Sequence, residues 1–176
     1  MTGIPERIAL VGLSGSGKST VARLLAGRLG WHLCDTDAMV EQMTGRSIPA
    51  LFAEEGEAAF REFEAAALAT ALARTPVVLA TGGGIVVRAS NRALLKERAL
   101  VVWLDAPTAV LIARLRAHRE KRPLLAGDDP AARLEALRAA RLPLYHEVAH
   151  LILDTSQMPP ERVAERIIAM AMRAEI

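Results

Sequence analysis

The sequence is poor in the features that mark secreted, metal-binding and membrane proteins. Cys34 is its only cysteine, which excludes an intramolecular disulfide and a metal site built from several cysteines, as expected for a reducing compartment. The apolar runs are shorter than the roughly 18 residues that suggest a transmembrane helix, and the N-terminal residues lack the apolar stretch of a signal peptide. We therefore expect a soluble, cytoplasmic protein, in which Cys34 is a small buried residue rather than a catalytic thiol.

A block of like charge is also absent. The 22 Lys and Arg residues nearly balance 20 Asp and Glu residues, the formal net charge is +2, and the basic residues are spread along the chain. This distribution does not favour general nucleic-acid binding. A length of 176 residues with 52% hydrophobic content suits one compact domain over residues 1–176. We expect a monomer that binds a small molecule.

Short apolar runs alternate with longer amphipathic stretches, a pattern typical of βα units around a parallel sheet. We predict strands over residues 8–11, 32–34, 77–80, 100–104 and 151–153, and helices over 18–29, 57–73, 90–97, 108–117, 130–142 and 160–172. Residues 35–55 contain a polar turn, a helix and a break at 45–47, and indicate an insertion over the carboxyl edge of the sheet. Residues 118–129 indicate an exposed, charged loop. The predicted fold class is α/β, with helices on both faces of a five-stranded parallel sheet.

The segment Gly12-Leu13-Ser14-Gly15-Ser16-Gly17-Lys18-Ser19 joins the first predicted strand to the first helix and matches G-x-x-x-x-G-K-[ST]. In such a loop, backbone N–H groups point at phosphate oxygens, Lys18 reaches the β- and γ-phosphates, and Ser19 ligates Mg²⁺. The residues assigned to nucleotide binding are Gly15, Ser16, Gly17, Lys18, Ser19 and Thr20. The alternatives are a glycine-rich turn without a ligand and a dinucleotide-binding loop, but the third glycine of G-x-G-x-x-G is missing.

Two carboxylates follow the second predicted strand, in Asp35-Thr36-Asp37. Because ligands of open α/β sheets bind at the carboxyl ends of the strands, both should lie near the phosphate loop. One carboxylate would help to hold Mg²⁺, and the other would orient and deprotonate an acceptor hydroxyl. The alternative for either is a helix N-cap. No acidic residue directly follows the third predicted strand, so Asp35 is the candidate for the metal side.

Glycines and arginines supply the remaining candidates. The triple glycine Gly82-Gly83-Gly84 follows the third predicted strand and offers a surface without side chains that a substrate can approach closely; a bare tight turn is the alternative. Arg61, Arg122 and Arg141 are candidates for anion binding, because the planar arginine fork suits carboxylates and phosphates. Each alone would be an ordinary surface arginine, and their spacing does not establish that they converge.

In order along the chain, the motifs G-x-x-G-x-G-K-S, D-T-D, F-R-x-x-E, G-G-G, R-P-L-L and R-x-P-L-Y resemble those of the shikimate kinase family, over about residues 8 to 154. The resemblance implies a P-loop kinase fold with strand order 2-3-1-4-5, a substrate-binding insertion over about 35–64 and a lid over about 118–129. It also implies ATP and Mg²⁺ as cofactors, and transfer of the γ-phosphate to the 3-hydroxyl of shikimate in chorismate and aromatic amino-acid biosynthesis.

The resemblance further implies roles for individual residues on the acceptor side. Asp37 would contact the ring hydroxyls and act as the base, and Asp35 would act beside Ser19 on the metal. Arg61 and Arg141 would bind the substrate carboxylate, with Gly82, Gly83 and Gly84 supporting the ring.

On the donor side, Lys18 would contact the phosphates as a catalytic residue. The lid would bring Arg122 to the phosphates as a second catalytic, nucleotide-binding arginine and would exclude water. An arginine before the lid would stack on adenine; Arg114 is preferred over Arg116 and Arg119 for this role.

Two alternatives remain at this point. The first is another small-molecule kinase of the same fold, such as a gluconate or nucleotide kinase, although the paired Arg61 and Arg141 favour an acidic ring substrate. The second is a ligand-sensing module without activity. The sequence contains no helix-turn-helix extension and keeps the proposed catalytic residues, which favours an enzyme.

Overall fold

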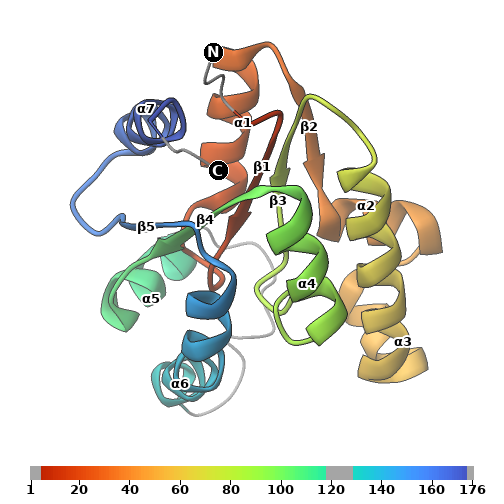
Figure 1. Cartoon of the computed structure of the whole chain (residues 1–176). Helices are drawn as coiled ribbons and strands as arrows, with labels where there is room; N and C mark the ends of the chain where they lie inside the picture. Colours follow the sequence, from red (N-terminus) through yellow and green to blue (C-terminus); the bar gives the residue numbers. More distant parts are fainter. Residues whose placement is uncertain (1–4, 118–128, 174–176) are drawn as a thin grey trace.

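The computed structural model describes residues 5–117 and 129–173, and its centre is a five-stranded parallel sheet (Figure 1). The strands are β1 (Arg7–Val11), β2 (His32–Asp35), β3 (Val77–Ala80), β4 (Leu100–Asp105) and β5 (Leu151–Asp154), in the order β2-β3-β1-β4-β5. Each predicted strand is present within a residue or so, and the strand order implied by the family resemblance is confirmed.

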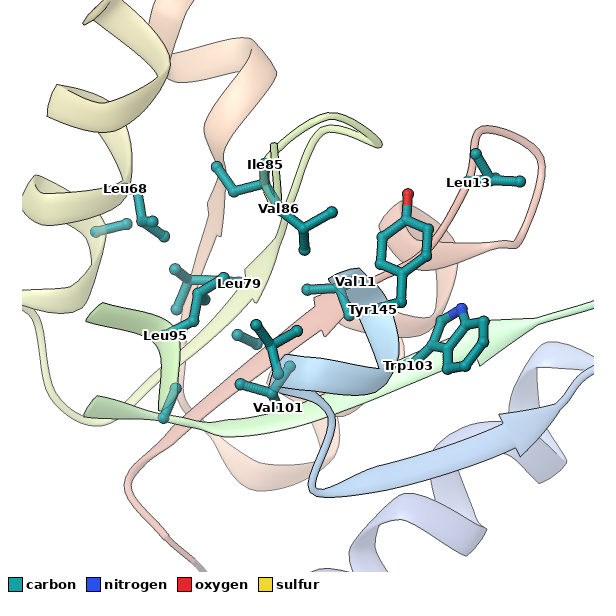
Figure 2. Packing of buried hydrophobic residues seen from close by; sticks show 14 of the residues in the cluster. Val11, Leu13, Leu68, Leu79, Ile85, Val86, Leu95, Val101, Trp103 and Tyr145 are labelled. Carbon is teal, nitrogen blue, oxygen red and sulfur yellow. The ribbon is translucent and has the colours of Figure 1, made fainter. Parts of the chain in front are cut away.

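Helices cover both faces of the sheet, which confirms the predicted three layers (Figure 1). Alternate β1 residues enter different clusters: Ile8 and Leu10 pack with α1 (Lys18–Leu29) and α7 (Pro160–Ala171). Ala9 and Val11 enter the opposite cluster, which contains side chains of α3 (Ile48–Leu72), α4 (Ala89–Arg98), α5 (Thr108–Ala117) and α6 (Pro130–Val148). Figure 2 shows part of this second cluster, in which Trp103 and Tyr145 lie near Val11.

The predicted insertion consists of α2 (Thr36–Thr44) and the first part of α3. The predicted break at 45–47 is present, because Gly45 ends α2 with φ 67° and the Ser47 hydroxyl caps α3. The helix predicted from residue 57 is preceded by another stretch that begins at Ile48, and the two meet at Gly56, whose φ of 83° and ψ of 176° are not helical.

Helix α6 is longer than the sequence predicts. The sequence predicts a helix over 130–142, whereas α6 continues through Pro143 to Val148, although a proline removes a backbone donor and crowds the preceding turn. Tyr145 and Val148 are both about 1% exposed in the core, so the burial of this last segment offsets the cost of the proline. The predicted lid lies almost entirely outside the described residues; Asp129 caps α6 by accepting a hydrogen bond from Ala132 N.

The register of the sheet brings the predicted site residues to one edge. Asp35 pairs with Ala80, Ala80 pairs with Leu10, and Val11 pairs with Trp103. The segments that follow β1, β2 and β3 therefore leave the sheet side by side, as expected for an open parallel sheet. Among the helices of the described residues, none is long and apolar enough to cross a membrane.

Candidate active site

The phosphate loop leaves β1 and enters α1 through three glycines with positive φ, Gly12 at 143°, Gly15 at 86° and Gly17 at 92°. These values favour glycine, because other residues adopt them at a cost. Space is limited as well: a Cβ on Gly15 would lie 2.9 Å from Leu111 O, and one on Gly12 would contact Leu104 O. The loop therefore lies directly against β4 and α5, at the N-terminus of α1, a helix with one buried face.

Lys18 begins α1 and folds back over the loop. Its side chain is 8% exposed, and Nζ donates to Leu13 O at 2.8 Å and to Ser16 Oγ at 3.4 Å. The ammonium group is thus held against the phosphate loop, and its contact with nucleotide phosphates stays a prediction.

Asp35 is a helix N-cap, one of the two roles that the sequence left open, and it also contacts Ser19. Its Oδ1 accepts hydrogen bonds from Asp37 N at 3.0 Å and Ala38 N at 3.2 Å and so caps α2. Its Oδ2 accepts a hydrogen bond from Ser19 Oγ at 3.1 Å. One carboxylate therefore fixes the start of α2 and also lies beside the hydroxyl predicted to ligate the metal.

Asp37 lies in the first turn of α2, close to the triple glycine. A Cβ on Gly82 would lie 2.5 Å from Asp37 Oδ1, so a side chain at this position would displace the carboxylate. Burial raises the pKa of Asp37, the negative charge of Asp35 raises it further, and Lys18 opposes both effects. A raised pKa makes the carboxylate more basic, which suits a group that must accept a proton.

The two predicted carboxylate-binding arginines converge on the other glycines. A Cβ on Gly84 would lie 2.6 Å from Arg61 Nη2, and one on Gly83 would lie 3.4 Å from Arg141 Nη1. Arg61 comes from α3 and Arg141 from α6. The triple glycine is therefore the point at which predicted residues from three separate helices meet, which spacing along the sequence did not reveal.

Arg61 is held by two acidic residues, and neither of them has a role predicted from the sequence. Its Nη1 donates to Glu64 Oε2 at 2.8 Å and its Nη2 to Glu57 Oε1 at 2.9 Å. Glu64 is 1% exposed, and burial raises its pKa while the hydrogen bond from Arg61 opposes that effect. The F-R-x-x-E motif could have indicated the contact between Arg61 and Glu64, because residues three apart on a helix are neighbours.

A cavity of about 1570 Å³ joins these parts. Its lining includes the loop residues Ser14 to Thr20, Asp35, Asp37, Gly82, Gly83, Arg114 and, on α3, Ile48, Pro49 and Phe52. Arg61, Gly84 and Arg141 are not among the lining residues; the two arginines lie next to Gly84 and Gly83. The cavity is thus continuous from the phosphate loop to Asp37, as a transfer between two bound molecules requires.

The donor-side arginines differ in what surrounds them. Arg114 lines the cavity and donates to Thr155 O at 2.6 Å, to Thr155 Oγ1 at 3.0 Å and to Gly15 O at 3.5 Å. Arg116 is exposed. Arg119 and Arg122 lie outside the described residues, so their predicted roles remain predictions.

Comparison with known proteins agrees with this geometry. A family model for shikimate kinase matches residues 14–172. The shikimate kinase of Halorhodospira halophila is 50% identical over 93% of this chain and 92% of its own length, and that of Oleidesulfovibrio alaskensis is 46% identical over 96% and 99%.

Solved structures give the same result. The shikimate kinase from Acinetobacter baumannii in complex with shikimate superimposes with a TM-score of 0.92 at 40% identity, over 99% of this chain and 97% of that one. A gluconokinase from Sinorhizobium meliloti, with a TM-score of 0.62 and 21% identity over 97% and 93% of the two chains, shares the fold alone. On these matches over nearly its whole length, the chain belongs to the shikimate kinase family.

Proposed function

We propose that this protein transfers the γ-phosphate of ATP to the 3-hydroxyl of shikimate, giving shikimate 3-phosphate and ADP. The observation that carries the proposal is the convergence of Asp37, Arg61 and Arg141 on the triple glycine, with Asp37 in the same cavity as the phosphate loop. A phosphate loop alone would suit any nucleotide hydrolase or kinase. A carboxylate next to two arginines suits an acceptor that carries both a hydroxyl and a carboxylate.

The phosphate loop would hold the donor. The N–H groups of residues 15–20 lie at the N-terminus of α1, where the helix dipole favours an anion. Lys18 would exchange its hydrogen bond to Leu13 O for phosphate oxygens. Arg114 would contact the adenine side of the nucleotide, since it lines the same cavity next to Gly15.

Ser19 and Asp35 would hold Mg²⁺. Their facing oxygens, 3.1 Å apart, are the hard ligands that Mg²⁺ prefers, and this ion usually keeps several waters and phosphate oxygens as its other ligands. Within the described residues there is no group of three acidic, histidine or cysteine side chains that could hold a metal, which fits an ion bound largely through the nucleotide. When bound, Mg²⁺ offsets the negative charge of the phosphates.

Asp37 would act on the acceptor. The hydroxyl oxygen forms a bond to the γ-phosphorus, the bond from that phosphorus to the bridging oxygen of ADP breaks, and the hydroxyl proton passes to the Asp37 carboxylate. The raised pKa of Asp37 favours this proton transfer. Arg61 and Arg141 would bind the substrate carboxylate with planar donor groups, and Glu57 and Glu64 would hold Arg61 in position.

Release of ADP, measured with different acceptors, tests the proposal. We expect turnover that depends on shikimate and on Mg²⁺, with little turnover when gluconate or a nucleoside monophosphate replaces shikimate. Equal turnover without shikimate, or a preference for gluconate, would overturn the proposed acceptor. A protein that binds ADP and shikimate without any turnover would instead support the sensing module.

A further inference from the structure

Tyr145 is the only tyrosine of the chain, and neither the fold nor the proposed chemistry assigns it a function. It closes the R-x-P-L-Y motif four residues after Arg141, so the two side chains lie on the same side of α6. Its exposure is 1%. Packing in the core explains the aromatic ring of Tyr145 but does not explain its hydroxyl group.

The phenol oxygen donates to Gly83 O at 2.5 Å. Figure 2 shows the ring within the apolar cluster and its oxygen pointing away from Val11 and Trp103. Because the C=O and N–H of a trans peptide point in opposite directions, a fixed Gly83 carbonyl also fixes the direction of the Gly84 N–H. The hydrogen bond therefore sets the orientation of a peptide within the triple glycine, a segment that has no side chains of its own to hold it.

The aromatic ring is itself held in place. It stacks on Trp103 of β4, with ring centroids 5.5 Å apart and an interplanar angle of 24°. Trp103 is 3% exposed and also contacts the His146 ring edge-on, with centroids 4.7 Å apart. The central sheet thus fixes the ring, and the ring fixes the glycine turn.

The same phenol faces Arg141. Burial raises the pKa of Tyr145 and keeps its hydroxyl protonated, while Arg141 opposes this effect through its charge and a hydrogen bond. Arg141 Nη1 would also lie 3.4 Å from a Cβ on Gly83. Tyr145 and Arg141 therefore both lie next to Gly83, the first through its hydrogen bond to the carbonyl and the second through its guanidinium.

We infer that Tyr145 is a positioning residue, whose hydroxyl sets Arg141 and the Gly83-Gly84 peptide in the arrangement that binds the acceptor carboxylate. This inference rests on the proposed function. It assigns Tyr145 to acceptor binding, because its polar contacts are with Gly83 and Arg141, both of which the proposed function places around the acceptor.

Tyr145→Phe tests the inference, since it removes the hydroxyl and keeps the ring against Trp103. We expect the KM for shikimate and the Kd of shikimate, measured by calorimetry without nucleotide, to rise about fivefold, the effect of one lost hydrogen bond. The KM for ATP and the Kd of ADP should stay within about twofold. A role in packing alone would not separate the two ligands in this way.

Val148→Ala is the matched control, because Val148 is buried in the same cluster one turn later on α6. It should lower the melting temperature and leave the KM for shikimate unchanged. An unchanged KM in Tyr145→Phe, or the same rise in both variants, would overturn the inference while leaving the proposed function standing. Absence of shikimate-dependent turnover in the unmodified protein would overturn both.

Discussion

Asp37 is the single residue on which the proposed chemistry depends most. Asp37→Asn keeps the size of the side chain and removes its ability to accept a proton, so kcat should fall by about 10²- to 10⁴-fold, the usual contribution of a general base. ADP affinity, measured by calorimetry, should remain, because the phosphate loop is unchanged. Turnover equal to that of the unmodified protein would contradict the role of Asp37 as base.

The same substitution should stabilise the fold. Burial and the neighbouring Asp35 raise the pKa of Asp37, so the folded state binds this proton more tightly than the unfolded chain does. This tighter proton binding at Asp37 stabilises the folded state fully below the ordinary carboxyl pKa of about 3.9. The stabilisation is lost as the pH rises through the raised pKa of the folded state. Asp37→Asn should accordingly raise the free energy of unfolding at pH 7 by about 1 kcal/mol, as stabilising changes at functional sites commonly do.

Urea denaturation at several pH values measures this difference, which should shrink as the solution is acidified. Asp154→Asn is a control of opposite sign, because hydrogen bonding to Ser156 lowers the pKa of Asp154. That variant should be less stable than the unmodified protein at pH 7, with the difference again shrinking in acid. A stability gain in Asp37→Asn that does not depend on pH would refute the electrostatic explanation.

Arg141 should act on acceptor binding rather than on the chemical step. Arg141→Ala removes one of the two charged partners proposed for the substrate carboxylate, so the KM for shikimate should rise by about 10- to 100-fold, as expected for a charge-assisted hydrogen bond. The KM for ATP, obtained from the same assays, should change little. If ATP affinity collapsed instead, the assignment of Arg141 to the carboxylate would be wrong.

At the scale of elements, the segments after β2 and β3 are joined by one buried hydroxyl. Thr36 Oγ1, in a residue with no exposed surface, accepts a hydrogen bond from Gly82 N at 3.1 Å. This contact holds the start of α2, which carries Asp37, against the triple glycine. Thr36 therefore connects the start of α2, which carries Asp37, to the triple glycine.

Two variants of Thr36 separate this hydrogen bond from packing. Thr36→Val keeps the shape of the side chain and leaves the buried Gly82 N–H without its acceptor, which should cost about 1 to 3 kcal/mol and lower kcat. Thr36→Ser keeps the oxygen and loses a methyl group, so its kcat should stay close to that of the unmodified protein. Chemical denaturation and steady-state assays check both values; a serine variant as impaired as the valine variant would show that the methyl group matters instead.

The elements that the sequence predicted and those that it missed differ in a physical way. All five strands were predicted from short apolar runs, and the three central ones, β1, β3 and β4, are buried on both faces. The edge strands β2 and β5 are partly exposed. The extension of α6 beyond Pro143 was missed, because the burial of Tyr145 and Val148 that supports it depends on distant partners. The helical stretch from Ile48 to Gly56 was missed for a similar reason: Leu51 lies in a small cluster with Val40 and Phe60.

The candidate site was predictable in its parts but not in its assembly. The phosphate loop, Gly12 to Ser19, could be recognised from the local sequence alone, because its conformation depends on its own glycines. The convergence of Arg61 and Arg141, which are far apart in the chain, follows only from the packing of α3 and α6 around the triple glycine. The same holds for the polar contacts of Thr36 and Tyr145, whose hydroxyls no local pattern assigns to a partner.

At the scale of the whole molecule, one cavity is lined both by the phosphate loop and by Asp37, Gly82 and Gly83. Two ligands that occupy different parts of it should both stabilise the folded state. A ligand at 100 times its Kd adds about 2.7 kcal/mol to the free energy of unfolding, which corresponds to a rise of about 5 to 10 °C in Tm for a domain of this size. ADP with Mg²⁺ and shikimate should each produce a shift of this kind, and together a larger one.

Thermal denaturation with each ligand tests nucleotide binding and acceptor binding separately. Gluconate at the same concentration should leave Tm unchanged, because it lacks the ring that the triple glycine would support. In Arg141→Ala, the shift with shikimate should shrink while the shift with ADP persists, since only the acceptor loses a partner. A shift with ADP but none with shikimate would support the nucleotide site and contradict the proposed acceptor. The phosphate loop would bind ADP even if Asp37, Arg61 and Arg141, which converge on the triple glycine, did not bind shikimate.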